Sequence, residues 1–326
     1  MCGIIGYSGP KEPLPILIGG LSRLEYRGYD SAGVAILDGE KLTIEKKEGK
    51  LQVLKDHLTN SKINGNIGIG HTRWATHGVP NDVNAHPHSD NQNEFAIIHN
   101  GIIENYAEMK DDLLKEGFVF ESDTDTEVVA VELGNQWTGR LLETVTNVAK
   151  KLDGTYALVV TSTKEPGTIV AGRMMSPLVL GVGEGETFLA SDSAAILEHT
   201  NKMIFLENGD FVEITNGKFK LFDENMNEIS REIQEIDWKV SEAEKSGYDH
   251  FMYKEILEQA EVIERTISGR LEIGSEEIPI DLNKAKEFEK IWIVACGTAY
   301  HAGLFGKDLF EKVLGVPVTD VRRVGR

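Results

Sequence analysis

The stretch of sequence that decides the fold runs from residue 155 to residue 223. It contains the runs TYALVVTST (155–163), TIVAG (168–172), LVLGVG (178–183), TFLASD (187–192), MIFLENGDFVEIT (203–215) and KFKLFD (218–223). β-Branched and aromatic residues fill these runs and glycine punctuates them, which is typical of short strands in an antiparallel sheet. This part of the chain is therefore predicted to form a sheet whose strands are joined by tight turns.

The residues before this stretch mix strands with helices. Apolar runs predict strands at residues 2–7, 31–37, 41–47, 67–71 and 95–99, and apolar residues three and four apart predict helices at 14–24, 51–58, 102–115, 126–137 and 141–151. Because predicted strands lie at both ends of residues 2–223 with helices between them, we predict a layered α+β domain and not a parallel, doubly wound one.

The composition excludes several classes of protein. The 326 residues include 34 Lys and Arg and 53 Asp and Glu, so the net charge is −19. This acidity opposes approach to phosphates, and we expect no nucleic-acid partner. No run reaches the roughly 18 to 20 apolar residues of a membrane span, and no secretory signal is recognised, so we expect no membrane partner and a cytoplasmic location. Two cysteines, Cys2 and Cys296, exclude a disulfide framework and fit a reducing compartment.

The character of the sequence changes after about residue 230. Residues 231–249 are acidic and polar and are predicted to link a domain at 1–230 to a second unit at 250–326. In this unit, apolar residues at 252–267 predict one face of a helix. Residues 291–294 are predicted to form a buried strand, which is followed by small residues and an apolar helix. One strand and one helix cannot close a parallel α/β domain. The unit is therefore predicted to be incomplete and to expose the apolar surface of its helix and strand.

Cys2 carries two reactive groups if Met1 is removed, as we expect for a methionine before a small residue. A free thiol has a pKa of about 8.5 and a free α-amine about 7.7 to 8.0, so the amine is a suitable base for its own thiol. One residue then supplies both nucleophile and base. The alternative is that Cys2 is a small buried residue on a strand.

Four polar segments lie where a predicted strand ends or a predicted helix begins: EYRGYDSAG (25–33), HTRWATHG (71–78), HNGIIEN (99–105) and SDTDTE (122–127). Taken singly, each is explained by a turn or a helix cap. Together with MCGI (1–4), and in this order, they resemble the class II glutamine amidotransferases. The match continues through NAHPH (84–88), SPLV (176–179), ASD (190–192), FLENGD (205–210), KEILEQ (254–259) and ACGTAYHAG (295–303). Within that class, EYRGYDSAG, RWATHG (73–78) and the sugar-isomerase opening at 295–303 favour a resemblance to the glutamine–fructose-6-phosphate aminotransferase (glucosamine-6-phosphate synthase) family.

The resemblance implies a fold and a reaction. The fold is a layered αββα sandwich of the N-terminal-nucleophile hydrolases, followed by an incomplete α/β sugar-isomerase unit. In the reaction, Cys2 attacks the side-chain carboxamide of glutamine, releases ammonia and forms a glutamyl thioester. The resemblance implies that the side-chain amide of Asn100 and the backbone N–H of Gly101 stabilise the oxyanion. Glycine allows that N–H to approach the site closely. No cofactor is implied.

The resemblance also implies the contacts with the substrate. Glutamine is a zwitterion, so Arg73 is expected to hold its α-carboxylate and an aspartate its α-ammonium. Asp123 and Asp125 are both candidates, and alignment of the Thr-Asp-Thr-Glu pattern favours Asp125. The other implied residues of the site are Arg27 beside the nucleophile, Gly28, the gating Trp74, and the loop residues Thr76 and His77.

Three alternatives stay open at this point. The first is a metal site, because five of the nine histidines lie between His71 and His99. Neither an HExxH pair nor a cysteine pattern supports such a site. The glutaminase domain of another class II amidotransferase is the second. A non-catalytic binding or regulatory remnant with a blocked N-terminus is the third.

The isomerase half that would use the ammonia is represented only by its beginning. Residues 295–303 resemble the first turn of its first lobe, whereas the later phosphate loops and catalytic residues are not in this sequence. The chain is either a piece of a longer protein or naturally short. We expect glutamine as its substrate, fructose 6-phosphate as a partner only of a full-length chain, and a homodimer formed through the isomerase part when complete.

Overall fold

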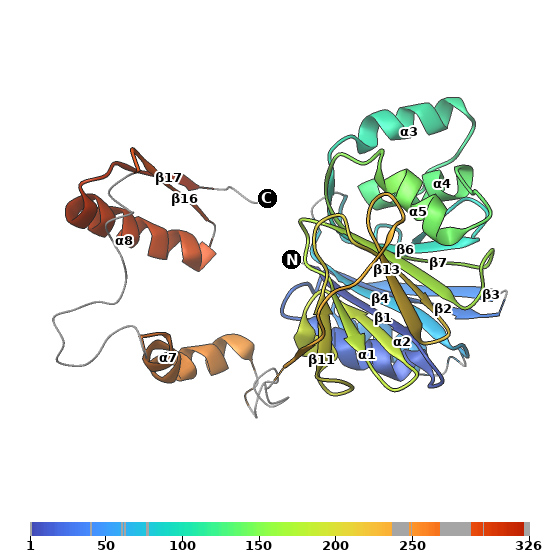
Figure 1. Cartoon of the computed structure of the whole chain (residues 1–326), viewed down its shortest axis with the longest axis horizontal. Coiled ribbons are helices and arrows are strands. Elements are labelled where there is room, and N and C mark those ends of the chain that lie inside the picture. Colours follow the sequence, from blue (N-terminus) through green and yellow to red (C-terminus); the bar gives the residue numbers. More distant parts are fainter. Residues whose placement is uncertain are drawn as a thin grey trace. The chain divides into compact units, whose positions relative to one another are not determined.

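The computed structural model describes residues 2–39, 41–59, 61, 63–75, 78–236, 248, 250–267, 288–295 and 297–322. The chain divides into two compact units, with the division between Ser246 and Gly247 (Figure 1). The first unit contains two antiparallel sheets with helices around them, and the second is a small α/β unit.

The first sheet has the strand order β15-β11-β9-β10-β1-β4-β2-β3. Its strands are β1 (Gly3–Ser8), β2 (Ser31–Asp38), β3 (Lys41–Glu48), β4 (Ile67–Arg73), β9 (Val179–Val182), β10 (Thr187–Ala190), β11 (Lys202–Phe205) and β15 (Gln234–Glu235). Strand β1 lies in the interior of the sheet, between β10 and β4. The residue that follows Cys2 therefore begins a strand that is paired on both edges.

The second sheet has the order β14-β13-β12-β8-β7-β6-β5. Its strands are β5 (His88–Ser89), β6 (Phe95–Ile103), β7 (Gly154–Ser162), β8 (Thr168–Met174), β12 (Phe211–Thr215), β13 (Lys218–Phe222) and β14 (Glu228–Ile229). The long pair β6 and β7 runs from Phe95 opposite Ser162 to Ile103 opposite Gly154. Most runs quoted from residues 155–223 are strands in one of the two sheets, as their composition predicts.

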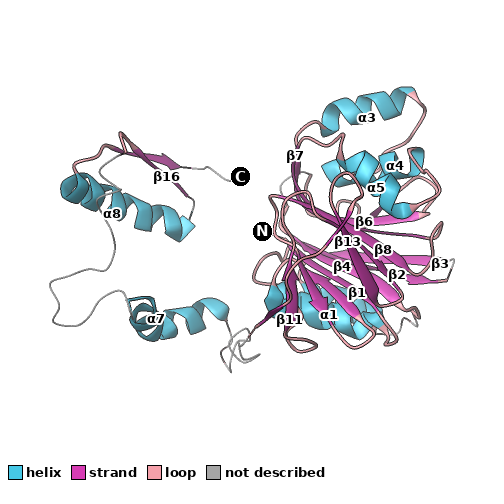
Figure 2. Cartoon of the chain, viewed as in Figure 1, coloured by secondary structure: helices cyan, strands magenta, loops and turns pink. Residues whose placement is uncertain are grey.

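The two sheets and the helices form four layers (Figure 2). Ile4, Ile69 and Ile98 belong to the core between the sheets. Helices α1 (Pro13–Leu24) and α2 (Leu51–Leu58) pack on the outer face of the first sheet, where Ile5 joins their core. Helices α4 (Asp125–Asn135) and α5 (Leu141–Ala149) cover the second sheet, and α3 (Tyr106–Lys115) packs over α4. The predicted αββα sandwich is confirmed.

One predicted helix begins later than expected. The apolar pattern of residues 102–115 predicted a helix from Ile102, but Ile102 and Ile103 are the last residues of β6 and α3 begins at Tyr106. The reason is tertiary pairing, because Ile102 and Ile103 lie opposite Thr155 and Gly154 of β7. The remaining predicted elements of this unit match helices and strands to within a few residues.

The second unit contains α7 (Phe251–Ile267), β16 (Ile291–Ala295), the 18-residue helix α8 (Gly297–Leu314) and β17 (Val318–Arg322). Strand β17 pairs in parallel with β16. The prediction that residues 291–294 are buried is wrong. Trp292 is 60% and Val294 63% exposed, because α8 covers only the opposite face of β16, where Ile293 meets Gly303.

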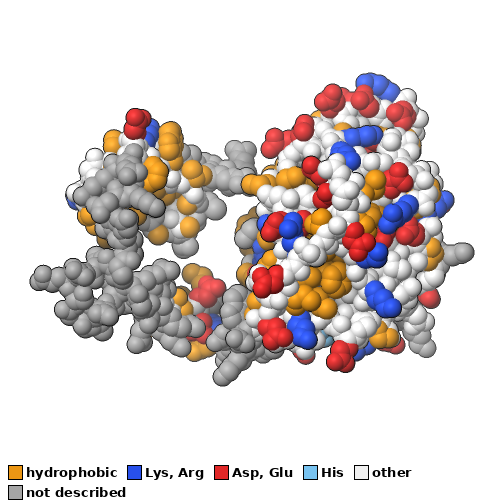
Figure 3. Space-filling model, in the orientation of Figure 1, with side chains coloured by type: hydrophobic (Ala, Val, Ile, Leu, Met, Phe, Trp, Pro, Cys, Tyr) orange, Lys and Arg blue, Asp and Glu red, His pale blue; other side chains and the backbone are white. Residues whose placement is uncertain are grey.

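Apolar side chains are exposed on the helices of this unit too (Figure 3). They are Met252, Tyr253, Ile256, Leu257, Val262 and Ile263 of α7, and Leu304, Phe305, Leu309, Phe310 and Val313 of α8. The predicted exposure of apolar surface is thus observed among the described residues. Most of the predicted linker, residues 237–247 and 249, lies outside the described residues, and so does Cys296. No described helix combines the length and the apolar character that crossing a bilayer requires.

Candidate active site

Cys2 lies at the entry to β1, where the end of β4 approaches it. The Cys2 thiol is half-buried, and its Sγ accepts a hydrogen bond of 3.1 Å from the backbone N–H of Trp74. Burial raises the pKa of the Cys2 thiol, and the Trp74 N–H opposes that rise because it stabilises a thiolate. A thiol with a raised pKa is mostly protonated near neutrality, so reaction as a nucleophile requires a base.

Asn100 and Gly101 reach the same place from the C-terminal half of β6. The Asn100 Nδ2 donates a hydrogen bond of 3.1 Å to the carbonyl oxygen of Cys2. Gly101 has a φ of +138°, and a Cβ there would lie 1.9 Å from the carbonyl oxygen of Thr155. Only glycine fits this backbone conformation next to β7, so the residue type follows from the local geometry.

Arg73 is the buried last residue of β4, directly before Trp74. Burial lowers the pKa of Arg73, and the charges of Cys2, Asp125 and Asp30 act in the opposite direction. The thiol of Cys2 and the carboxylate of Asp125 thus both act electrostatically on the guanidinium. Such an arrangement offers a cation and an anion near one nucleophile, as a zwitterionic ligand requires.

The two candidate aspartates occupy different environments. Asp125 is buried in the first turn of α4, after the N-cap Thr124, and its Oδ2 accepts a hydrogen bond of 2.9 Å from the N–H of Ile103. Asp123 is exposed, and its Oδ2 is 3.4 Å from the Nδ2 of Asn84. Asp125 is thus tied to the strand that carries Asn100, and Asp123 is not.

Arg27, Gly28 and Trp74 lie in segments that pack around the same strand ends. The buried Arg27 Nη1 donates to the Ser191 carbonyl oxygen and to Asp192 Oδ2, both at 3.1 Å. A Cβ on Gly28 would lie 2.8 Å from the carbonyl carbon of Arg73, so glycine allows this close approach. Trp74 is 44% exposed and packs edge-on against Tyr29. Thr76 and His77 lie outside the described residues.

The clustered histidines are held by threonines. His86 Nε2 and His99 Nδ1 each lie 2.9 Å from Thr126 Oγ1, and His88 Nε2 lies 3.0 Å from Thr124 Oγ1. Burial lowers the pKa values of His86 and His88 well below the usual range. Within the described parts of the chain, no three His, Cys, Asp or Glu side chains are grouped so that they could hold a metal ion.

His71 belongs to the segment HTRWATHG, but the sequence alone assigned no role to it. In the structure its Nε2 lies 3.0 Å from Asn100 Oδ1 and 3.0 Å from the carbonyl oxygen of His99. A signal was present, because alternate residues of a strand share a face and Ile67 and Ile69 face the core between the sheets. The same period places His71 on that inner face, toward β6.

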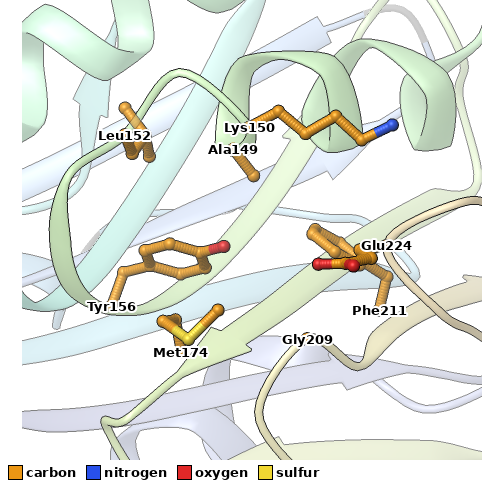
Figure 4. A pocket seen from close by; sticks show the side chains of 8 residues that line it. All are labelled: Ala149, Lys150, Leu152, Tyr156, Met174, Gly209, Phe211 and Glu224. Atoms are coloured by element: carbon orange, nitrogen blue, oxygen red, sulfur yellow. The ribbon is translucent and has the colours of Figure 1, made fainter.

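A separate groove of about 240 Å³ lies between the end of α5 and the second sheet (Figure 4). Figure 4 shows the Tyr156 hydroxyl and the Glu224 carboxylate pointing toward one another across it. Burial, and secondarily the charge of Glu224, raises the pKa of Tyr156. None of the residues that line the groove is among the predicted site residues.

Known proteins resemble this chain over most of its length. Residues 56–251 match a family model described as "Glutamine amidotransferase domain". Glutamine--fructose-6-phosphate aminotransferase [isomerizing] of Clostridium tetani is 48% identical over 98% of this chain and 53% of its own length, and that of Aquifex aeolicus is 48% identical over 97% and 53%. The chain thus spans about half the length of these curated relatives.

A solved structure supports the fold independently. Glutamine phosphoribosylpyrophosphate amidotransferase from B. subtilis, complexed with ADP and GMP, aligns with a TM-score of 0.61 and 29% identity, over 70% of this chain and 50% of that protein. The family model covers more than half of the chain, and the relatives extend the match over nearly all of it. The chain therefore belongs to the glutamine amidotransferase family.

Proposed function

We propose that the chain hydrolyses glutamine to glutamate and ammonia through a thioester on Cys2. The observation that carries this proposal is the meeting of Cys2 with the end of β4 and the C-terminal half of β6. The Trp74 N–H contacts the thiol at 3.1 Å and the Asn100 amide contacts the same residue at 3.1 Å. A nucleophile and a donor for a developing oxyanion are thus supplied by three neighbouring strand ends.

The reaction needs a base, because burial raises the pKa of the thiol. With Met1 removed, the α-amine of Cys2 takes the proton of the thiol as the sulfur attacks the carboxamide carbon of glutamine. The same proton passes to the leaving nitrogen, the carbon–nitrogen bond breaks, and ammonia departs. Water then attacks the thioester carbon, which releases glutamate and returns a proton to the sulfur.

The charged ends of glutamine are assigned to Arg73 and Asp125. A guanidinium binds a carboxylate through paired hydrogen bonds, and a buried carboxylate favours an ammonium. Gly101 adds a backbone N–H to the Asn100 amide at the oxyanion. Residues around the substrate are proposed to be Arg27, Gly28, Trp74, Thr76 and His77.

We propose further that the chain is the glutamine-hydrolysing half of an enzyme that synthesises glucosamine 6-phosphate. The support is that the relatives, which match nearly the whole chain and extend beyond it, are glutamine--fructose-6-phosphate aminotransferases. In a full-length protein the ammonia passes to fructose 6-phosphate, and the isomerase part forms a homodimer. Residues 250–326 are the start of that part, after a glutaminase domain at 1–230 and a linker at 231–249. The free thiol persists in a reducing compartment, which favours the cytoplasm.

Three measurements on the purified chain test the proposal. Intact mass reports whether Met1 has been removed, and a glutaminase assay with and without fructose 6-phosphate reports the activity. A diazo-ketone analogue of glutamine is expected to label Cys2, which peptide mapping detects. Glutamine hydrolysis that resists chelators is expected. A processed chain that neither hydrolyses glutamine nor takes the label contradicts the proposal and favours a non-catalytic role.

A further inference from the structure

The histidine that contacts Asn100 is completely buried and has a defined protonation state. His71 Nε2 faces two oxygens, the side-chain Oδ1 of Asn100 and the backbone oxygen of His99, each at 3.0 Å. A carbonyl oxygen only accepts hydrogen bonds, so Nε2 must carry the hydrogen and donate it. The Nδ1 of His71 has no hydrogen-bond partner within the described residues, which suits an unprotonated nitrogen.

This tautomer determines which way the Asn100 amide faces. If the amide were turned over, its NH₂ would meet the N–H of His71, and its oxygen would meet the carbonyl oxygen of Cys2. Both contacts would be repulsive, because they pair donor with donor and acceptor with acceptor. The observed orientation keeps the NH₂ group on the side of Cys2.

The His71 ring is itself held in place. It packs against the His86 ring with a centroid separation of 4.3 Å, and it stays neutral because burial lowers its pKa to about 3. Its donor is therefore present throughout the pH range in which a glutaminase works. A fixed, uncharged donor orients a neighbour without adding a charge that would compete with the substrate.

We infer that His71 is a positioning residue for glutamine hydrolysis, which keeps the NH₂ group of Asn100 directed at the oxyanion formed beside Cys2. The inference rests on the proposed function and goes beyond it, since the hydrogen-bond partners of His71 Nε2 are Asn100 and the His99 carbonyl oxygen. It acts through Asn100 alone. Its effect must therefore disappear when the Asn100 side chain is removed.

A double-mutant cycle tests this dependence. The variants are His71→Leu, which keeps bulk and loses the donor, Asn100→Ala, and the two combined. We expect His71→Leu to lower kcat about 10- to 100-fold, less than the 10²- to 10³-fold typical of deleting an oxyanion donor, with KM changed less than about threefold. In the Asn100→Ala background, the same substitution is expected to lower kcat less than about twofold.

Two further variants separate positioning from folding. His71→Gln places an amide N–H near the former Nε2 and is expected to recover most of the lost kcat. His199→Leu removes another imidazole that stacks on an aromatic ring, that of Phe188, away from Asn100, and is expected to leave kcat unchanged. Thermal midpoints of all variants are recorded alongside the kinetics.

The outcomes are distinct. Suppose that the wild-type chain is active. The positioning role alone is overturned if His71→Leu lowers kcat equally with and without the Asn100 side chain, or if His71→Gln does not recover kcat. A wild-type chain, shown by mass to have lost Met1, that hydrolyses no glutamine overturns the proposed function instead. A fall in kcat confined to the Asn100-containing background, with recovery by His71→Gln, supports the inference.

Discussion

The Asn100 Nδ2 donates a hydrogen bond to the carbonyl oxygen of Cys2, so a residue of the second sheet is joined to the start of the central strand of the first. This bond crosses the core between the two sheets. It places the group proposed to stabilise the oxyanion and the nucleophile in one rigid unit. The αββα packing is therefore the direct cause of the geometry on which the proposed chemistry depends.

Replacing the nucleophile is the first test. Cys2→Ala is expected to abolish glutamine hydrolysis, because the thioester cannot form without the sulfur. The measurement is glutamate release by the purified variant. Cys296→Ala is the matched control and is expected to keep full activity. Hydrolysis that survives in Cys2→Ala would refute the mechanism.

Removing the proposed oxyanion donor is the second test. Asn100→Ala is expected to lower kcat about 10²- to 10³-fold with little change in KM, since the oxyanion exists mainly in the transition state. Steady-state kinetics measure both constants. Asn225→Ala, at an exposed turn, serves as the control. A rise in KM at constant kcat would instead assign Asn100 to ground-state binding.

The two aspartates give a third, internally controlled comparison. Asp125→Asn keeps an acceptor for the Ile103 N–H but loses the charge, and it is expected to raise the KM for glutamine about 10- to 100-fold, in line with the loss of a hydrogen bond to a charged group. Asp123→Asn is expected to change KM less than about twofold, because Asp123 is exposed. Equal effects of the two substitutions would show that the substrate ammonium is assigned to the wrong carboxylate.

The buried histidines predict how stability depends on pH. Burial lowers the pKa of His71 to about 3 and those of His86 and His88 well below the usual value, so all three stay neutral in the folded state, whereas the unfolded chain protonates them near pH 6.5. The unfolded state then binds more protons, and stability is lost as the pH falls below about 6.5.

For three such groups the free energy of unfolding is expected to fall by on the order of 4 kcal/mol between neutrality and pH 5.5. Urea unfolding at pH 7.5, 6.5 and 5.5 measures this fall. The same experiment detects the contrary result: a free energy of unfolding that stays constant over this range would mean that the histidines take up protons in the folded state to the same extent as in the unfolded chain.

Much of the first unit could be predicted from residue patterns. The continuous apolar run of β2 indicates a strand that is buried on both faces, and the leucine spacing of α1 and α2 indicates helices that are buried on one face. Both patterns are local. The site residues were recognisable because Cys2, Arg73, Asn100 and Asp125 stand at element ends in a family order. Their spatial meeting was implied by that resemblance, not by the spacing of the residues.

The features that sequence reasoning missed depend on partners distant in the chain. The strand character of Ile102 and Ile103 comes from pairing with β7, more than 50 residues later, and so overrides a helical pattern. The exposure of Trp292 and Val294 reflects which face of β16 is covered by α8, which an apolar run does not reveal. The orientation of His71 toward Asn100 required the stacking of two sheets.

Asp125 is fastened to the backbone of Ile103, three residues beyond Asn100 on the same strand. On the proposed roles, the group that receives one end of the amino acid and the group that receives its reacting end cannot drift apart. A fixed separation between Asp125 and Asn100 favours amino acids whose side chain has the matching length. On the same roles, the amide carbon of asparagine, which is one methylene shorter, is expected to fall short of the sulfur. The strand that carries Asn100 and Ile103 is then expected to favour glutamine over asparagine.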